Sequence, residues 1–264
     1  MDAPHIFNPW WGCTKVSPGC AHCYAETLSN RWAPGIWGPG KSRRTFPEKH
    51  WNEPLHWNEA AKEAAERRRC FCGSMCDWAE DGAPEGELEK LWPLIRKTPW
   101  LDWLLLTKRP EKIKERLPKD WDGDLVLPNE HRASRRYFNV WMGTSIENKD
   151  YIWRAGELIK IPCAAHFISA EPLLGSLQEL SLDHIEWVIV GAESGADFRE
   201  MKVEWARELR DKCLDTTQTA FFFKQSSGRF SGMNPVLDEK TWHEFPWTEM
   251  NHIVKGRLPF KRAV

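Results

Sequence analysis

Seven short apolar runs recur along the chain, and segments with a helical pattern separate most of them. The runs are Ile6–Trp11, Cys70–Met75, Leu101–Thr107, Phe138–Thr144, Ala165–Ser169, Trp187–Val190 and Ala220–Phe223. Apolar residues point to both sides of each run, as expected of strands that are covered on both faces. Short strands that alternate with helices predict βα units and a parallel sheet.

Four of the intervening segments combine charged residues with the apolar period of an amphipathic helix. They are NEPLHWNEAAKEAAERRR, PEGELEKLWPLIRKT, KDYIWRAGELIKI and KVEWARELRDKCLD. A chain of 264 residues suits one large domain, since α/β barrels reach about 250 residues without splitting. We therefore predict an α/β fold, a partial or complete TIM-like (β/α) barrel of about 6 to 8 parallel strands, over residues 1–230. Residues 231–264 are expected to form a C-terminal extension packed on that barrel.

Charge and hydropathy limit the classes of protein to which the chain can belong. The 37 basic and 38 acidic residues nearly cancel, so any attraction to nucleic acid must be local. The sequence has no secretory signal pattern and no apolar stretch of about 18 residues, so we expect a cytoplasmic protein without a membrane partner. Eight cysteines in a reducing compartment predict metal or cluster ligands in place of disulfides.

Polar residues follow six of the apolar runs, in GSMCD, LLLTKRP, GTSIEN, ISAEP, VGAESG and FFFKQSSG. The carboxyl ends of parallel strands meet on one face of a barrel, where barrel enzymes place their active sites. A single polar strand end is also explained by the turn and cap residues that any strand end needs. Six such ends together predict a shared site, and the stretch NPWWGC after the first run is expected on the same face.

Three cysteines lie close together after the first run, with the spacing C-x6-C-x2-C at Cys13, Cys20 and Cys23. Gly12 and Gly19 allow the backbone of this loop to wrap a compact inorganic group. Thiolates select zinc or iron–sulfur clusters. A structural zinc site needs four ligands, and ligation by both His22 and its neighbour Cys23 would be strained. Three thiolates on a 4Fe-4S cluster instead leave one iron open to a chelating molecule such as S-adenosylmethionine.

The stretch NPWWGCTKVSPGCAHCYAE resembles the cluster loop of radical S-adenosylmethionine (radical SAM) enzymes. It is most similar to the spore photoproduct lyase-like branch, whose loop reads approximately N-P-Y-x-G-C, then C-x-x-C-Y-A-R. This chain departs from that pattern at Trp10 and Glu26, and its first two cysteines lie farther apart. The strand ends LLLTKRP, GTSIEN, FISAEPLLG, WVIVGAESG and FFFKQ resemble a largely phage-associated group of the superfamily, although CFCGSMCDW departs from it.

The resemblance implies a radical enzyme with a 4Fe-4S cluster, held by the three cysteines, and bound S-adenosylmethionine. The reduced cluster would split this cofactor into methionine and a 5′-deoxyadenosyl radical, which abstracts a hydrogen atom from the substrate. An external electron donor such as flavodoxin or ferredoxin is implied as a partner. Analogy with photoproduct lyase favours nucleic acid or a nucleotide as the substrate, for repair or modification.

The resemblance and the strand-end positions together supply candidate cofactor-binding residues. His22 matches a position near the adenine, Tyr24 belongs to the loop motif, and Ser74 and Asp77 match positions near the methionyl amine. We assign Lys108 to the methionyl carboxylate, with a solvated turn as the alternative for Lys108 and Arg109. Contacts to the amine or ribose are expected from Ser145, Ser169 and Glu171. In a dry pocket, Glu171, Glu193 and Lys224 should pair with one another or with a ligand, because an isolated buried charge is costly.

The remaining cysteines and the tryptophan-rich segment have less specific interpretations. Cys70, Cys72 and Cys76 are interpreted as core residues, with a second cluster as the alternative, and Cys163 and Cys213 as isolated core residues. Residues 31–57, with four tryptophans, are expected to form a loop over the barrel mouth. Its tryptophans either roof the core, which we favour, or stack nucleic-acid bases.

Three basic runs are candidates for a phosphate-facing patch only if the fold gathers them. They are RRR at 67–69, RASRR at 132–136 and KGRLPFKR at 255–262. Residues 118–136 are interpreted as an insertion between βα units. Two other functional classes remain open: a non-catalytic nucleic-acid-binding module stabilised by zinc or a cluster, and a radical SAM enzyme that acts on a peptide or small metabolite.

Overall fold

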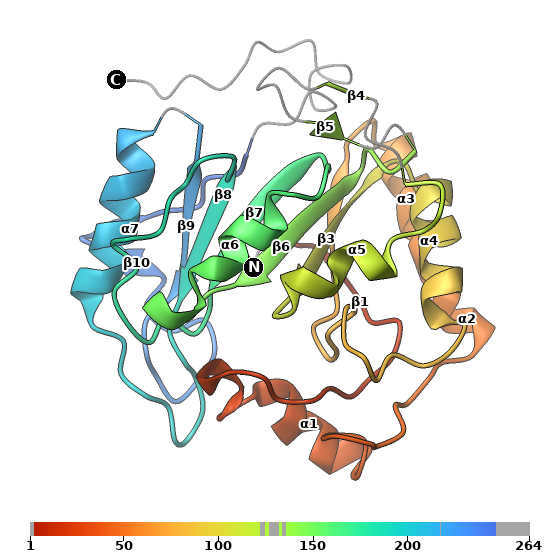
Figure 1. Ribbon diagram of the computed structural model, residues 1–264, viewed down its shortest axis with the longest axis horizontal. Helices are drawn as coiled ribbons and strands as arrows, with labels where there is room; N and C mark the ends of the chain where they lie inside the picture. Colours follow the sequence, from red (N-terminus) through yellow and green to blue (C-terminus); the bar gives the residue numbers. More distant parts are fainter. Residues whose placement is uncertain (1–2, 122–124, 127–131, 134–135, 217, 247–264) are drawn as a thin grey trace. The chain divides into compact units, whose positions relative to one another are not determined.

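The computed structural model describes residues 3–121, 125–126, 132–133, 136–216 and 218–246. The fold is mixed α/β (Figure 1), and its main sheet has seven strands in the order β1-β2-β3-β6-β7-β8-β9. Strands that follow one another in chain order are typical of a (β/α) barrel, whereas a doubly wound sheet reverses its order partway. The predicted α/β fold with a partial TIM-like barrel topology is therefore confirmed.

The chain divides into two compact units. The first comprises Met1–Val16, Ala25–Met142 and Ile161–Ala164, and the second comprises Ser17–Tyr24, Gly143–Lys160 and Ala165–Val264. Strand β6 (Val140–Ser145) contributes residues to both units. The cysteine loop is likewise shared in sequence, since Cys13 belongs to the first unit and Cys20 and Cys23 to the second.

The first unit contains three parallel strands, β1 (His5–Phe7), β2 (Arg68–Cys72) and β3 (Leu101–Thr107). Its helices are α1 (Tyr24–Trp32), of which Tyr24 counts with the second unit, α2 (Glu48–Trp51), α3 (Glu53–Glu63), α4 (Glu87–Lys97) and α5 (Ile113–Arg116). A 3-10 helix at Pro110–Lys112 and the antiparallel pair β4 (Leu125–Val126) and β5 (Arg132–Ala133) complete it. Helix α3 packs against α4 and β3.

The second unit contains the parallel strands β7 (Ala165–Ala170), β8 (Trp187–Gly191) and β9 (Ala220–Gln225). Helix α7 (Val203–Asp215) packs against β8 and β9. Short elements are the 3-10 helices Pro18–Cys20 and Lys149–Tyr151, helix α6 (Trp153–Leu158), and the antiparallel pair β10 (Val236–Leu237) and β11 (Lys240–Thr241). Every residue of β7 and β8 is buried, as expected of parallel strands that are covered on both faces.

All seven predicted strands are present, but two of them end earlier than predicted. Strand β1 stops at Phe7 because the Asn8 side chain leaves the sheet and its Oδ1 accepts a hydrogen bond from the Met75 backbone N–H at 2.7 Å. Strand β2 stops at Cys72 because Gly73 has a φ of 90°, which a strand cannot continue through.

Buried aromatic and sulfur side chains fill the interior of each unit. Fully buried rings include Trp10, Trp78 and Trp103 in the first unit and Trp187 in the second. All eight cysteines are free, and the five outside the cysteine loop are buried, as expected of core residues: Cys70, Cys72, Cys76, Cys163 and Cys213. No helix in the described part of the chain is long and apolar enough to cross a membrane.

The prediction that residues 31–57 form a loop is wrong for part of that segment. Helix α2 and the start of α3 lie within it, and the connection between α1 and α2 is irregular. Trp51 is buried, which agrees with a roof over the core, whereas Trp32 is 67% exposed. The start of α3 was predicted as helical by the segment NEPLHWNEAAKEAAERRR, whereas α2 was missed because Pro and Trp residues around it obscure the helical period.

Packing around Gly143 in β6 leaves no space for a side chain. A Cβ atom at this position would lie 2.2 Å from the Phe167 ring, and a Cβ at Gly156 in α6 would meet nothing within 4 Å. We expect Gly143→Ala to lower the free energy of unfolding by about 1–3 kcal/mol through overpacking. Gly156→Ala is the matched control and should raise it by about 0.5–1 kcal/mol. Urea unfolding of both variants tests this, and equal stabilities would contradict it.

Candidate functional site

The cysteine loop begins where β1 ends, and hydrogen bonds from its first residues attach it to the segment after β2. The Asn8 side chain donates to Ser74 Oγ at 3.0 Å, and the backbone N–H of Gly12 donates to the Met75 carbonyl at 3.0 Å. Gly12 has a φ of 113°, and a Cβ there would lie 2.4 Å from the Ile36 carbonyl oxygen. A side chain at position 12 would therefore displace the backbone that supports Cys13.

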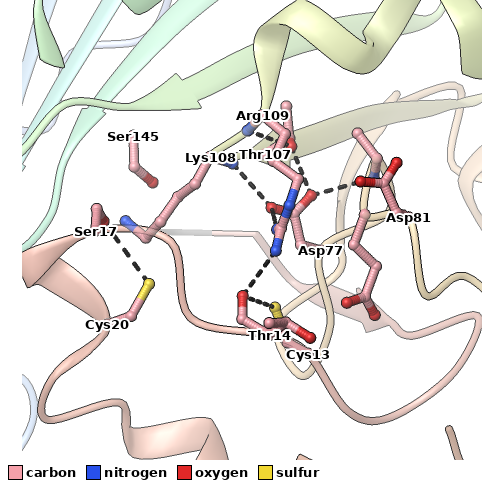
Figure 2. Close-up of polar contacts among 12 residues, drawn as sticks. Cys13, Thr14, Ser17, Cys20, Asp77, Asp81, Thr107, Lys108, Arg109 and Ser145 are labelled. Atoms are coloured by element: carbon pink, nitrogen blue, oxygen red, sulfur yellow. Dashed lines mark hydrogen bonds and ion pairs between the residues drawn. The ribbon is translucent and has the colours of Figure 1, made fainter. Parts of the chain in front are cut away.

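A buried guanidinium holds the backbone next to Cys13. Arg109 donates to the Thr14 carbonyl at 2.7 Å and to Asp77 Oδ2 at 2.6 Å, as Figure 2 shows. Its exposed fraction is only 8%, so the alternative of a solvated turn is wrong for Arg109. The pair ties the loop after β1 to the ends of β2 and β3 within the first unit.

Asp77 is fully engaged by protein donors. Besides Arg109, it accepts hydrogen bonds from Thr107 Oγ1 at 2.5 Å, from the Lys108 backbone N–H at 3.1 Å and from the Ala79 backbone N–H at 3.1 Å. Four bonds occupy the acceptor sites of a carboxylate. Asp77 thus fixes the strand ends, and its predicted contact with a cofactor amine stays a prediction.

A second buried pair supports the same turn. Arg43 donates to both carboxylate oxygens of Glu80, at 2.9 and 2.8 Å, and to Thr14 Oγ1 at 2.8 Å. Both side chains are nearly inaccessible, at 2% and 1% exposure. Sequence reasoning missed this pair because Arg43 lies in a Pro- and Gly-rich segment with no periodic signal. The only sequence signal for Arg43 was its place in a short basic run, KSRR at 41–44.

The Cys13 thiol lies in an environment that disfavours its anionic form. Burial raises the pKa of Cys13, and the negative charges of Asp77 and Glu80 raise it further, while Arg109 partly offsets them. A bound metal ion would reverse this preference, because its positive charge would favour the thiolate form of a coordinating cysteine.

In the second unit, Glu147 anchors the start of the segment that carries the other two cysteines. Its Oε1 accepts from Ser17 Oγ at 2.6 Å and its Oε2 from Arg154 at 3.0 Å, and it is completely buried. A Cβ at Gly19 would lie 2.5 Å from Glu147 Oε1. Glycine at position 19 is therefore required by this close approach. Ser17 Oγ also lies 3.7 Å from Cys20 Sγ (Figure 2).

Glu193 anchors the middle of that segment through two partners. It accepts from the backbone N–H and Nε of Arg199 at 2.8 and 2.9 Å, and it lies 3.1 Å from His22 Nδ1. Arg199 also donates to the Pro18 carbonyl at 3.0 Å. Burial alone would raise the pKa of Glu193, but the Arg199 and His22 hydrogen bonds outweigh it and lower that pKa.

Glu171 and Lys224 form the ion pair that the sequence predicted. Lys224 Nζ lies 2.7 Å from Glu171 Oε1, and Ser169 Oγ donates to Glu171 Oε2 at 3.0 Å. Gly191 on the intervening strand β8 leaves room for the Glu171 carboxylate to contact Lys224, since a Cβ there would lie 2.9 Å from Glu171 Oε1. Glu193 does not join this pair and binds Arg199 instead.

The other predicted residues are distributed between the two units. The first unit holds Cys13, Ser74, Asp77 and Lys108; the second holds Cys20, His22, Cys23, Tyr24, Ser145, Ser169, Glu171, Glu193 and Lys224. Tyr24 is 58% exposed, Ser145 and Ser169 are buried, and Lys108 is half-buried. Within the described residues, no group of three or more His, Cys, Asp or Glu side chains is arranged to hold a metal ion.

Arg67 does not contribute to the candidate phosphate-facing patch, because its side chain is only 3% exposed and donates to Asp102. In the run at 132–136 the side chains of residues 132–135 lie outside the described residues, and so does the whole run at 255–262. The insertion at 118–136 contains the β4–β5 pair.

Comparison with known proteins finds one family. A family model described as "Protein of unknown function (DUF5131)" matches residues 3–251, which is nearly the whole chain and includes the cysteine loop. No curated protein and no solved structure matches. The family description names no reaction.

The Glu171–Lys224 pair generates a test of both stability and pH dependence. Removal of one partner leaves a half-buried charge, so Glu171→Gln or Lys224→Met should each cost about 1–3 kcal/mol of unfolding free energy, less than for a fully buried pair because Lys224 is one-third exposed. The double variant should cost less than the sum of the two. Additive losses in a double-mutant cycle would contradict this coupling.

The sign of the pH dependence follows from the direction of each shift. Burial would raise the pKa of Glu171, but Lys224 outweighs it and lowers that pKa below its ordinary 4.5, and Glu171 raises the pKa of Lys224 above 10.5. The contribution of Glu171 is therefore present above pH 4.5 and lost as the pH falls through its lowered pKa. Urea unfolding of wild type and double variant should converge in acid and differ most near neutral pH.

Proposed function

We propose that this chain, which belongs to the DUF5131 family, is a radical SAM enzyme whose cluster is held by Cys13, Cys20 and Cys23. The observation that carries the proposal is the support of the cysteine loop. Four carboxylate–guanidinium pairs hold residues beside the cysteines through backbone and hydroxyl groups. Such support fixes the backbone on either side of the thiols.

The donor set and the backbone fit an iron–sulfur cluster. All three cysteines are free and only partly buried, unlike the five cysteines of the core. Gly12 and Gly19 let carbonyl and carboxylate oxygens approach where side chains would clash. Three thiols with no fourth cysteine on the loop favour a cluster with one open iron over a four-ligand zinc site.

When bound, the cluster supplies one electron that cleaves S-adenosylmethionine reductively, yielding methionine and the 5′-deoxyadenosyl radical that takes a hydrogen atom from the substrate. The residues of this chain then bind and orient the cofactor and the substrate, and they exclude water from the site. Glu193 orients the His22 ring through Nδ1, and Glu171 with Lys224 offers a paired anion and cation for polar groups of the cofactor. An external flavodoxin or ferredoxin is the proposed electron donor, and nucleic acid or a nucleotide is the proposed substrate class.

Anaerobic reconstitution with iron and sulfide tests the proposal. We expect a brown protein with about four iron atoms per chain that forms 5′-deoxyadenosine from S-adenosylmethionine and dithionite. Cys20→Ala should lose the colour and the nucleoside product. Cys213→Ala, which removes a buried core thiol from the same unit, should retain both.

Three results would overturn all or part of the proposal. A colourless protein with one zinc per chain would favour a zinc-stabilised binding module. Nearly eight iron atoms per chain would add a second cluster at the core cysteines. Product formation that nucleic acid neither changes nor competes with would favour a peptide or metabolite as substrate.

A further inference from the structure

The first unit contains a pocket of about 460 Å³ that none of the candidate cofactor residues lines. Helices α2, α3 and α4 provide most of its wall, together with Phe46. Its volume lies in the lower half of the range for small-molecule sites, which is about 300–1,000 Å³. It is large enough for one planar ring system with a substituent.

One side of the pocket is apolar and aromatic. Phe46, Trp51, Leu55 and Leu94 line it, and Trp51 is held edge-on by the Phe7 ring with centroids 5.2 Å apart. Trp51 is only 8% exposed, so its position is fixed by the core. Rigid aromatic walls of this kind suit a flat aromatic ligand, since stacking needs no particular hydrogen-bond pattern.

The α4 side of the pocket adds positive charge. Lys90 pairs with Glu87 at 2.6 Å and its Nζ lies 5.7 Å from the Trp51 ring centroid. Lys97 also lines the pocket, and no residue in the described part of the chain forms an ion pair with it. An exposed ammonium beside an aromatic wall is suited to a phosphate attached to a flat ring.

Polar groups at the pocket can form hydrogen bonds with the edge of such a ring. Asn52 offers both a donor and an acceptor, and Glu48 offers an acceptor. The Trp51 Nε1–H is buried and has no acceptor among the described residues. A buried donor without a partner is costly, and a ligand carbonyl would satisfy it.

Aromatic and cationic side chains connect this pocket with the cysteine loop inside the first unit. The Arg44 guanidinium lies 4.9 Å from the Trp11 ring centroid and 5.5 Å from that of Phe46. Trp11 and Phe46 pack edge-on at 5.8 Å, and Trp11 precedes Cys13 by two residues. Alternating rings and cations are typical of grooves that bind single-stranded nucleic acid.

We propose that the pocket holds one nucleotide of a single-stranded nucleic acid. Its base lies against Phe46 and Trp51, and its phosphate is bound by Lys97. The track of Arg44, Trp11 and Phe46 receives the adjoining nucleotide. This inference rests on the proposed function, because it names the substrate class of the same enzyme.

Fluorescence anisotropy of a labelled thymidine oligonucleotide of about 12 residues tests the pocket with the full-length purified chain, without added cofactor. Lys97→Glu removes the phosphate ligand, and Leu55→Trp fills the pocket. We expect each to weaken binding about tenfold at about 50 mM salt, and wild-type binding to weaken as salt rises to about 200 mM.

Matched variants separate the pocket from general effects. Lys62→Glu makes the same charge change on an exposed α3 lysine outside the pocket, and Ala60→Trp places the same indole on the exposed side of α3. Both should bind within about twofold of wild type. Thermal unfolding of all four variants confirms that each is folded.

Three results would overturn the inference. They are absence of wild-type binding, equal losses for Lys97→Glu and Lys62→Glu, or equal displacement of the oligonucleotide by an acidic peptide. The two proposals fail separately. Oligonucleotide binding without 5′-deoxyadenosine formation contradicts the radical chemistry, and the reverse contradicts the pocket.

Discussion

The cysteine loop depends on four pairs of carboxylate and guanidinium groups, of which all but the partly exposed Glu193–Arg199 pair are buried. Asp77 with Arg109 and Glu80 with Arg43 hold Thr14 in the first unit, and Glu147 with Arg154 and Glu193 with Arg199 hold Ser17, Pro18 and His22 in the second. A buried ion pair contributes little net stability, because desolvation of both charges offsets their attraction. Its effect is to fix geometry, since a guanidinium in such a pair donates in set directions. Fixed geometry matters most where a loop has little regular structure of its own.

The strand pattern was predictable because burial on both faces leaves an apolar run that no other element requires. The strand ends were predictable for the same reason. The change from apolar to polar residues marks the position where the buried strand ends. The pairing of Glu171 with Lys224 also followed from the sequence, because opposite charges at the buried ends of strands rarely remain isolated. Helix boundaries were less accurate, as the tryptophan-rich segment before α3 shows.

The arginine partners were not predictable. Arg43 and Arg199 lie in irregular segments, where no period predicts which side chain turns inward. Their positions depend on contacts distant in sequence, with Glu80 for Arg43 and with the Pro18 carbonyl for Arg199. Asp77 was identified as a functional position from sequence, but its four hydrogen bonds to protein donors show a supporting role that only coordinates reveal.

The contact between Glu171 and Lys224 crosses an entire strand. Glu171 directly follows β7 and Lys224 lies on β9, and the missing side chain at Gly191 leaves the gap through which the carboxylate passes. Positions 171, 191 and 224 are therefore coupled, since a change at any of them alters the constraint on the other two. A shorter acid at 171 would fall short of the ammonium, and a larger residue at 191 would close the passage even if both charges were kept.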